Sequence, residues 1–189
     1  MRKPKRSNFG GRKRNGSCHL PPPFKPDDME KKIQQVEYEE YKAASELPAD
    51  DLSLLEMARK TVEDAYAPYS RFRVGAALQL ANGQRVTGTN QENASYPVGI
   101  CAERTALSTA SSLYPGVAVQ ALAVSYRNEL GSSVKPISPC GICRQTICEY
   151  QQRFGTPIRI IMAGLTGPVI IIRDAGSLMP LSFSSSDML

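Results

Sequence analysis

Three cysteines and one glutamate stand in two short segments whose spacing is typical of a metal site. The first segment holds Cys101 and Glu103, and the second holds Cys140 and Cys143. Three thiolates can bind a zinc ion and leave its fourth tetrahedral position to water, and a carboxylate beside that position can move the protons of the water. This set of residues therefore predicts a hydrolytic metal site.

The spacing also predicts how these side chains are positioned. Cys140 and Cys143 are three residues apart, so on a helix they share one face, and Pro139 before them suits the first turn of a helix. Cys101 and Glu103 are two residues apart and would point roughly 200° away from each other on an ideal helix. We therefore expect Cys101 at the extreme N-terminal end of its helix, where the backbone is not yet helical.

The charge of such a site needs compensation, because zinc with three thiolates carries a net negative charge that weakens it as a Lewis acid. Helix N-termini supply part of the positive charge. Arg104 and Arg144 immediately follow the two segments, and we expect their side chains to donate hydrogen bonds to the sulfurs.

A structural zinc site or cysteines buried in a core are the alternatives to an open catalytic site. A structural site is closed by a fourth protein ligand, and Cys148 is the candidate. Five residues beyond Cys143, it would lie about 140° round the helix, so we expect it to pack in the core. A non-enzymatic zinc or nucleic-acid binding module is disfavoured by the same missing ligand and by Glu103.

The positive charge of the chain lies at its N-terminus. The net charge is +5, but residues 1–14 contain seven basic side chains and no acidic one, whereas residues 49–189 contain 12 basic and 11 acidic side chains. Affinity for a polynucleotide comes from neutralising its phosphates. The near-neutral body therefore argues against a nucleic-acid partner.

We expect three regions along the chain. Residues 1–28 are predicted to be a disordered basic and Pro-rich tail, residues 29–48 an extension packed on the body, and residues 49–189 the catalytic domain. Met29 is an alternative start. The chain lacks an apolar run of about 20 residues and an apolar signal segment, and its five cysteines are an odd number. We therefore expect a cytoplasmic protein that does not enter a membrane.

Hydrophobic periodicity predicts an α/β fold with a mixed sheet and helices on both faces. Asp50 or Asp51 is expected to cap the first helix, which ends before Pro68, and Asn82-Gly83 is expected to join two strands in a hairpin. The other expected elements are helices over 101–113 and 140–151 and strands over 73–80, 84–89, 117–125, 158–162 and 169–172.

Five stretches of the sequence share a family pattern: residues 69–77 (YSRFRVGAA), 90–97 (NQENASYP), the two cysteine segments and residues 178–183 (LMPLSF). Together they resemble the small, homotetrameric, three-cysteine type of cytidine deaminase. Zinc-dependent nucleobase deaminases have the same order of metal segments, a Cys/His-x-Glu segment followed by Pro-Cys-x-x-Cys. The resemblance implies a three-layer α/β/α sandwich with about five strands, one Zn²⁺ per subunit and a role in pyrimidine salvage.

The resemblance also assigns roles to individual residues. Asn90 and Glu92 match the pair that hydrogen-bonds the ribose, and alternate residues of an extended strand face the same way. Phe72 matches the aromatic residue at the pyrimidine, Tyr96 a tyrosine of the pocket, and Phe183 an aromatic residue contributed by a neighbouring subunit. From the residues alone, Phe72 in the core, Asn90 in a turn and Phe183 on a hydrophobic edge remain alternatives.

The implied reaction is the hydrolytic deamination of cytidine and deoxycytidine to uridine, deoxyuridine and ammonia, catalysed by a hydrolase of the carbon–nitrogen bond of a cyclic amidine. Glu103 is expected to carry the proton of the zinc-bound water to ring N3 and a second proton to the leaving amino group. The alternatives are a nucleoside-like substrate of the blasticidin type and polynucleotide cytosine. A pocket that bonds ribose hydroxyls favours the free nucleoside.

Overall fold

The computed structural model describes residues 29–188. The predictions for residues 1–28 lie outside this range. Residues 34–189 form one compact unit, and the description that follows concerns this unit. Among the described residues, no helix has the length and apolar character needed to cross a membrane.

A mixed sheet of six strands forms the centre of the fold, in the order β1-β6-β5-β4-β2-β3. The bounds are β1 (Glu39–Tyr41), β2 (Phe72–Leu80), β3 (Arg85–Thr89), β4 (Val119–Asn128), β5 (Arg159–Ala163) and β6 (Val169–Ile172). Only the β4–β5 pair is parallel among these strands. The expectation of about five strands was one too few, because a short strand from residues 39–41 pairs with β6 at the edge.

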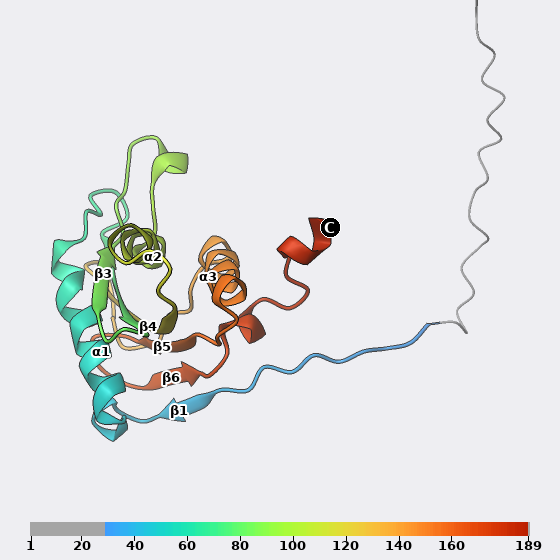
Figure 1. Ribbon diagram of the computed structural model, residues 1–189. Coiled ribbons are helices and arrows are strands. Elements are labelled where there is room, and N and C mark those ends of the chain that lie inside the picture. Colours follow the sequence, from blue (N-terminus) through green and yellow to red (C-terminus); the bar gives the residue numbers. More distant parts are fainter. Residues whose placement is uncertain (1–28, 189) are drawn as a thin grey trace, which may run out of the picture. The chain divides into compact units, whose positions relative to one another are not determined.

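Helices cover both faces of the sheet, as Figure 1 shows. Helix α1 (Ala49–Thr61) lies on one face, and α2 (Ala102–Leu113) and α3 (Gly141–Phe154) lie on the other. The predicted three-layer α/β/α architecture is therefore confirmed. Helix α3 connects the parallel strands β4 and β5, which is the usual way to join parallel neighbours.

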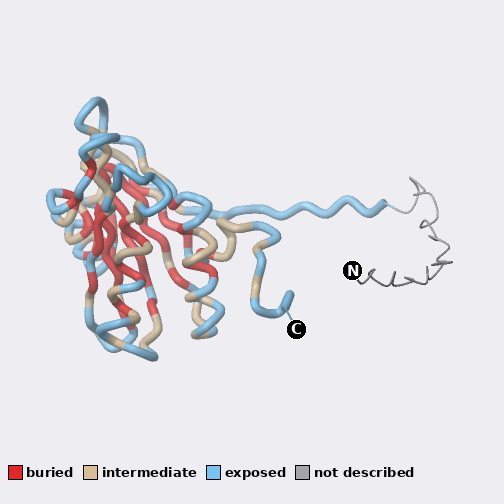
Figure 2. The backbone as a smooth tube through the Cα atoms, turned by 90° about the horizontal axis from the view of Figure 1, so that it is seen from above, coloured by how far each residue is buried: buried red, intermediate tan, exposed pale blue. Residues whose placement is uncertain are grey.

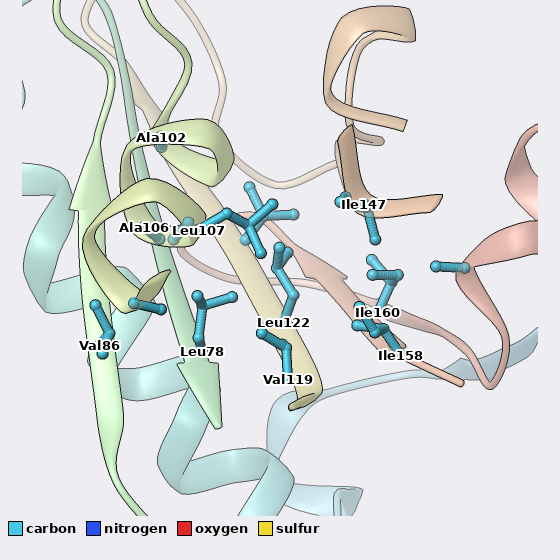
Figure 3. Close-up of a cluster of buried hydrophobic side chains, with 14 of the residues drawn as sticks. Leu78, Val86, Ala102, Ala106, Leu107, Val119, Leu122, Ile147, Ile158 and Ile160 are labelled. Carbon is cyan, nitrogen blue, oxygen red and sulfur yellow. The ribbon is translucent and has the colours of Figure 1, made fainter. Parts of the chain in front are cut away.

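The alternating side chains of the central strands build two hydrophobic cores. Along β4, Ala121 and Ala123 face α1, whereas Leu122 and Val124 face α2 and α3. Small residues on the first face let α1 approach closely. On the second face, β4 carries the larger side chains Leu122 and Val124, which pack beneath Leu107 and the other apolar residues of these helices (Figure 3). The buried residues follow the strands through the middle of the unit (Figure 2).

Two local predictions differ from the structure at helix starts. Pro48 occupies the cap position of α1, so neither predicted aspartate caps it. Asp51 instead lies buried in the first turn, where its Oδ1 accepts a hydrogen bond of 2.5 Å from Nη2 of Arg159. Pro139 precedes the cap residue of α3, so it lies outside the first turn. At α1, the carboxylate of Asp51 is engaged by Arg159, a tertiary contact that local propensity does not contain.

The predicted hairpin is present, with β2 and β3 paired in antiparallel register. Gly83 in its turn has a φ of 83°, a left-handed conformation that glycine adopts without steric cost. The hairpin places Phe72 at the entrance of β2 and Asn90 immediately after β3, so these two residues lie at the same end of the sheet.

Candidate metal and catalytic site

The three cysteines stand at the N-terminal ends of α2 and α3. Cys101 is the residue before α2 and has extended backbone angles, φ −77° and ψ 154°, as its spacing to Glu103 required. Cys140 holds the same position before α3, with φ −68° and ψ 168°. Cys143 lies in the first turn of α3 and is buried. Two helix N-termini therefore converge on one group of sulfurs.

The sulfur geometry fits one tetrahedral metal ion. The distance from Cys140 Sγ to Cys101 Sγ is 3.8 Å and to Cys143 Sγ is 3.5 Å, and the three sulfurs lie within 4.8 Å of one another. Sulfurs bound to one zinc ion at about 2.3 Å in tetrahedral geometry would be about 3.8 Å apart. The group contains three thiols, and no fourth ligand side chain joins them among the described residues. One coordination position of a tetrahedral ion would therefore stay open.

Cys148 does not belong to this group. Its side chain is buried, and its Sγ lies 4.0 Å from the carbonyl oxygen of Ala175, on the side of α3 that faces the chain after β6. This placement agrees with the expectation that Cys148 packs in the core.

The protonation of the site follows from its hydrogen bonds and burial. The thiol of Cys143 donates a hydrogen bond to Cys101 and stabilises the Cys101 thiolate. This bond, with smaller contributions from Cys140 and from the charge of Arg104, lowers the pKa of Cys101 to about 6. The same bond raises the pKa of Cys143. Burial raises the pKa of Glu103, whose side chain is 5% exposed. A carboxyl group with a raised pKa suits an acid–base role near neutral pH.

A cavity of about 430 Å³ opens beside the sulfurs. It brings together residues from three regions of the chain, 72–74, 90–103 and 137–140, all of them at one end of the sheet. Of the residues selected from the sequence, it is lined by Phe72, Asn90, Glu92, Tyr96, Cys101, Glu103 and Cys140. A volume of this size is typical of a small-molecule site.

The side chain of Asn90 is bonded to the backbone of β2. Its Oδ1 accepts a hydrogen bond of 2.7 Å from the amide of Val74, and its Nδ2 donates one of 2.9 Å to the carbonyl of Phe72. Each group keeps one further bonding position, since an amide oxygen has two lone pairs and an amide nitrogen two hydrogens. Asn90 therefore continues the β2–β3 ladder with its side chain and still lines the cavity.

The carboxylate of Glu92 is half-buried and accepts backbone hydrogen bonds through Oε2, from the amides of Tyr69 (2.9 Å) and Ser70 (3.2 Å). Burial alone would raise the pKa of Glu92, but these bonds and the Ser70 side chain outweigh it, so the pKa is lowered. Glu92 is therefore an ionised acceptor at neutral pH.

The aromatic residues differ in their placement. Phe72 is stacked on Tyr126, with ring centroids 4.7 Å apart and planes at 17°. Tyr96 lies at the cavity edge, 76% exposed, and makes an edge-to-face contact of 6.1 Å with Tyr69. Phe183 is 59% exposed and does not line the cavity of its own chain. The carbonyl of Phe183 accepts a hydrogen bond of 2.8 Å from Nε2 of Gln145 in α3.

Arg144 makes bonds other than the predicted ones. Its Nε donates to the carbonyl of Pro139 at 2.8 Å and its Nη1 to that of Leu178 at 3.2 Å. The predicted bonds to sulfur from Arg144 and Arg104 are absent among the hydrogen bonds of the described residues. Arg144 is an anchor for the loop before Cys140, while Arg104 acts on Cys101 through its charge.

Sequence reasoning left out several residues around the site, of which three show why. Ile137 and Ser138 line the cavity, and Tyr126 supports the ring of Phe72. Ile137 and Ser138 directly precede Pro139-Cys140, so their position beside a metal segment was an available signal. Tyr126 lies one residue beyond the predicted strand and gave no comparable signal.

Residues 48–154 match the family model described as the cytidine and deoxycytidylate deaminase zinc-binding region. This match covers more than half of the chain and contains all three cysteines and Glu103. The chain belongs to this zinc-binding deaminase family.

Known members of the deaminase family are similar over most of the body. A cytidine deaminase of Halalkalibacterium halodurans is 38% identical over 139 residues, which are 74% of this chain and 98% of the relative. A crystal structure of cytidine deaminase from Burkholderia pseudomallei matches with a TM-score of 0.61 and 38% identity, covering 72% of this chain and 100% of that one. A blasticidin-S deaminase of Bacillus cereus is 30% identical over 102 residues, 53% of this chain and 72% of the relative.

Proposed function

We propose that the protein catalyses the zinc-dependent hydrolytic deamination of cytidine and deoxycytidine to uridine and deoxyuridine with release of ammonia. The observation that carries this proposal is one cavity that contains Glu103 and two of the three clustered cysteines together with Asn90 and Glu92. Zinc held by Cys101, Cys140 and Cys143 would supply an activated water at its open position.

Glu103 is the residue that moves protons in this proposal. Its burial raises its pKa, and a raised pKa brings a carboxyl group closer to the pH at which acid–base catalysis works. Glu103 takes a proton from the attacking water and gives it to ring N3, so that C4 becomes electrophilic and the water oxygen bonds to it. Glu103 then moves the second proton of that water to the amino group, and the C4–N bond breaks to release ammonia and leave a C4 carbonyl. The chain thus provides both proton transfers with one side chain.

Substrate placement is assigned to the residues around the cavity. Phe72 packs at the pyrimidine, Tyr96 lines the entrance, and Asn90 and Glu92 bond the ribose hydroxyls through the positions that their backbone bonds leave open. The similarity spans 98% of the cytidine deaminase of H. halodurans but only 72% of the blasticidin-S deaminase of B. cereus. This difference and the ribose-facing pair favour cytidine over a blasticidin-type substrate, and the near-neutral body disfavours polynucleotide cytosine.

We further propose that the enzyme is a cytoplasmic homotetramer of pyrimidine salvage, in which Phe183 serves the cavity of a neighbouring subunit. The exposure of Phe183 and its position outside the lining of its own cavity support this assignment.

The decisive experiment compares zinc content and cytidine turnover in one preparation of wild-type protein and of Glu103→Gln. We expect about one zinc per chain in both proteins, and a loss of turnover of about 10²- to 10⁴-fold in the variant. Turnover is followed by the ultraviolet absorbance of cytidine. Wild-type protein that holds zinc and leaves cytidine unchanged would contradict the proposed function.

A further inference from the structure

The turn that leads into β2 has an unusual backbone. Arg71, immediately before Phe72, has a φ of 54°, a left-handed conformation that a residue with a side chain adopts at a steric cost. Two backbone hydrogen bonds of 3.0 Å hold it, from its amide to the carbonyl of Ala67 and from the amide of Glu129 to its carbonyl. This conformation turns the chain just before the residue that lines the cavity.

A chain of hydrogen bonds connects this turn to the cavity. Glu92 Oε2 accepts the amides of Tyr69 and Ser70, as described above, and the hydroxyl oxygen of Ser70 accepts the amide of Phe72 at 3.1 Å. The amide of Phe72 is therefore bound to Ser70, and Ser70 is bound to Glu92.

The carbonyl side of Phe72 is held as well, by Nδ2 of Asn90. The backbone of Phe72 is thus fixed by Ser70 on one side and Asn90 on the other, while its ring is stacked on Tyr126. With the backbone and the ring plane both constrained, Phe72 has little freedom to leave the cavity wall.

We propose that Ser70 is a positioning residue for Phe72, and that Glu92 divides its two oxygens between tasks: Oε2 holds the 69–71 turn and Oε1 is left for a ribose hydroxyl. This inference rests on the proposed function for the identity of the substrate. The carboxylate of Glu92 would then bind the sugar directly and, through Ser70, hold the ring of Phe72 at the base. The two parts of a nucleoside would be recognised by residues that are hydrogen-bonded to one another.

A double-mutant cycle tests whether Ser70 acts through Phe72. Ser70→Ala should lower kcat/KM for cytidine about fivefold, the usual effect of one lost hydrogen bond, and Ser70→Thr should restore it because threonine keeps the hydroxyl. In a Phe72→Leu background, Ser70→Ala should have little further effect. Equal losses in both backgrounds would overturn the proposal.

A second measurement tests the tether without using activity. Hydrogen exchange of overlapping peptides that span residues 69–74 should show faster exchange at the amide of Phe72 in Ser70→Ala and near wild-type exchange in Ser70→Thr. Unchanged exchange in Ser70→Ala would refute the tether. If wild-type protein does not deaminate cytidine but the exchange result is as expected, the proposed function fails and the positioning of Phe72 by Ser70 stands.

The chain offers a matched control and a second variant. Ser112 is exposed near the end of α2, about three turns from Cys101, and its hydroxyl donates to the carbonyl of Ser108 at 3.0 Å. Ser112→Ala should change neither kcat/KM nor exchange at Phe72. Ser70 is also exposed, so Ser70→Ala should fold. Ser70→Cys, with its weaker sulfur acceptor, gives the same test should the alanine variant fail to fold.

Discussion

At the scale of single residues, the cysteines of the body divide into three whose sulfurs meet and one that packs elsewhere. Cys140→Ser should lose bound zinc, because it replaces one of three thiolates with a hydroxyl group that remains protonated. Cys148→Ala should keep about one zinc per chain and lose only about 1 kcal/mol of stability, since Cys148 packs in the core beside Ala175. Metal analysis of both purified variants checks this. Zinc loss in Cys148→Ala alone would exclude the assigned ligand set.

Single residues were predictable from the sequence where the chemistry restricts the geometry. A tetrahedral ion accepts only sulfurs that meet at one point, so the separation of Cys140 and Cys143 and the position of Cys101 before its helix could be predicted. The partners of Arg144 could not. A long guanidinium side chain can reach several carbonyl groups, and the choice of Pro139 and Leu178 depends on the path of residues distant in the sequence.

At the scale of secondary structure, periodicity predicted the helices and strands of the body but not their close approaches. Helix α2 lies directly on β3 at Gly88, where an added Cβ would collide with the backbone nitrogen of Ala106 and lie 2.6 Å from the carbonyl oxygen of Ala102. Helix α1 makes the same kind of contact with β2 at Gly75. Such contacts depend on helix–sheet distances, which a periodic pattern does not contain. The short β1 escaped prediction because three residues are too few to show alternation.

Substitutions at Gly75 and Gly88 can distinguish a loss of fold stability from a loss of zinc binding. Gly88→Ala and Gly75→Ala should each destabilise the fold by about 1 to 3 kcal/mol, because the helix must move away from the sheet. Only Gly88→Ala displaces the helix that carries Cys101 and Glu103, so only this variant should also weaken zinc binding. Thermal unfolding and a competitive zinc chelator measure the two effects. Equal zinc affinities in both variants would contradict the prediction.

At the scale of the whole molecule, strand β1 and the C-terminal segment contact the rest of the body in different ways. Strand β1 closes the sheet edge at β6, where Glu39 accepts hydrogen bonds of 2.6 and 3.0 Å from the guanidinium of Arg173. The C-terminal segment carries Phe183 on the surface. The sequence alone predicted neither the pairing of β1 with β6 nor the bond from Gln145 to the carbonyl of Phe183, because both join residues more than 30 positions apart.

The ion pair at β1 gives a pH-dependent prediction. The bond from Arg173 lowers the pKa of Glu39 below its usual value of about 4.5. The pair therefore stabilises the fold above that value, and its contribution is lost as pH falls through the lowered pKa. Arg173→Ala should cost less than about 1 kcal/mol at pH 7, because both partners are partly exposed. The difference from wild type should disappear at lower pH, as followed by thermal unfolding. A difference that grows on acidification would contradict it.

Subunit mixing tests the role proposed for Phe183. Phe183→Ala and Glu103→Ala should each have low activity alone. In mixed oligomers, a Phe183→Ala subunit keeps Glu103 and receives Phe183 from a Glu103→Ala neighbour, so activity should recover. Cytidine turnover of the two variants, unfolded and refolded together or separately, measures this recovery. A mixture no more active than the sum of the separate proteins would place Phe183 outside the neighbouring site.

The separation of Cys101 and Cys140 has a consequence for folding. The two cysteines are 39 positions apart, and the chain between them includes α2 and all of β4, the strand that joins the two halves of the sheet. An ion bound by both sulfurs would act as a cross-link that closes this loop and reduces the conformational freedom of the unfolded chain. The metal ion would then also stabilise the central sheet, and the temperature of unfolding would rise with the fraction of protein that holds the ion.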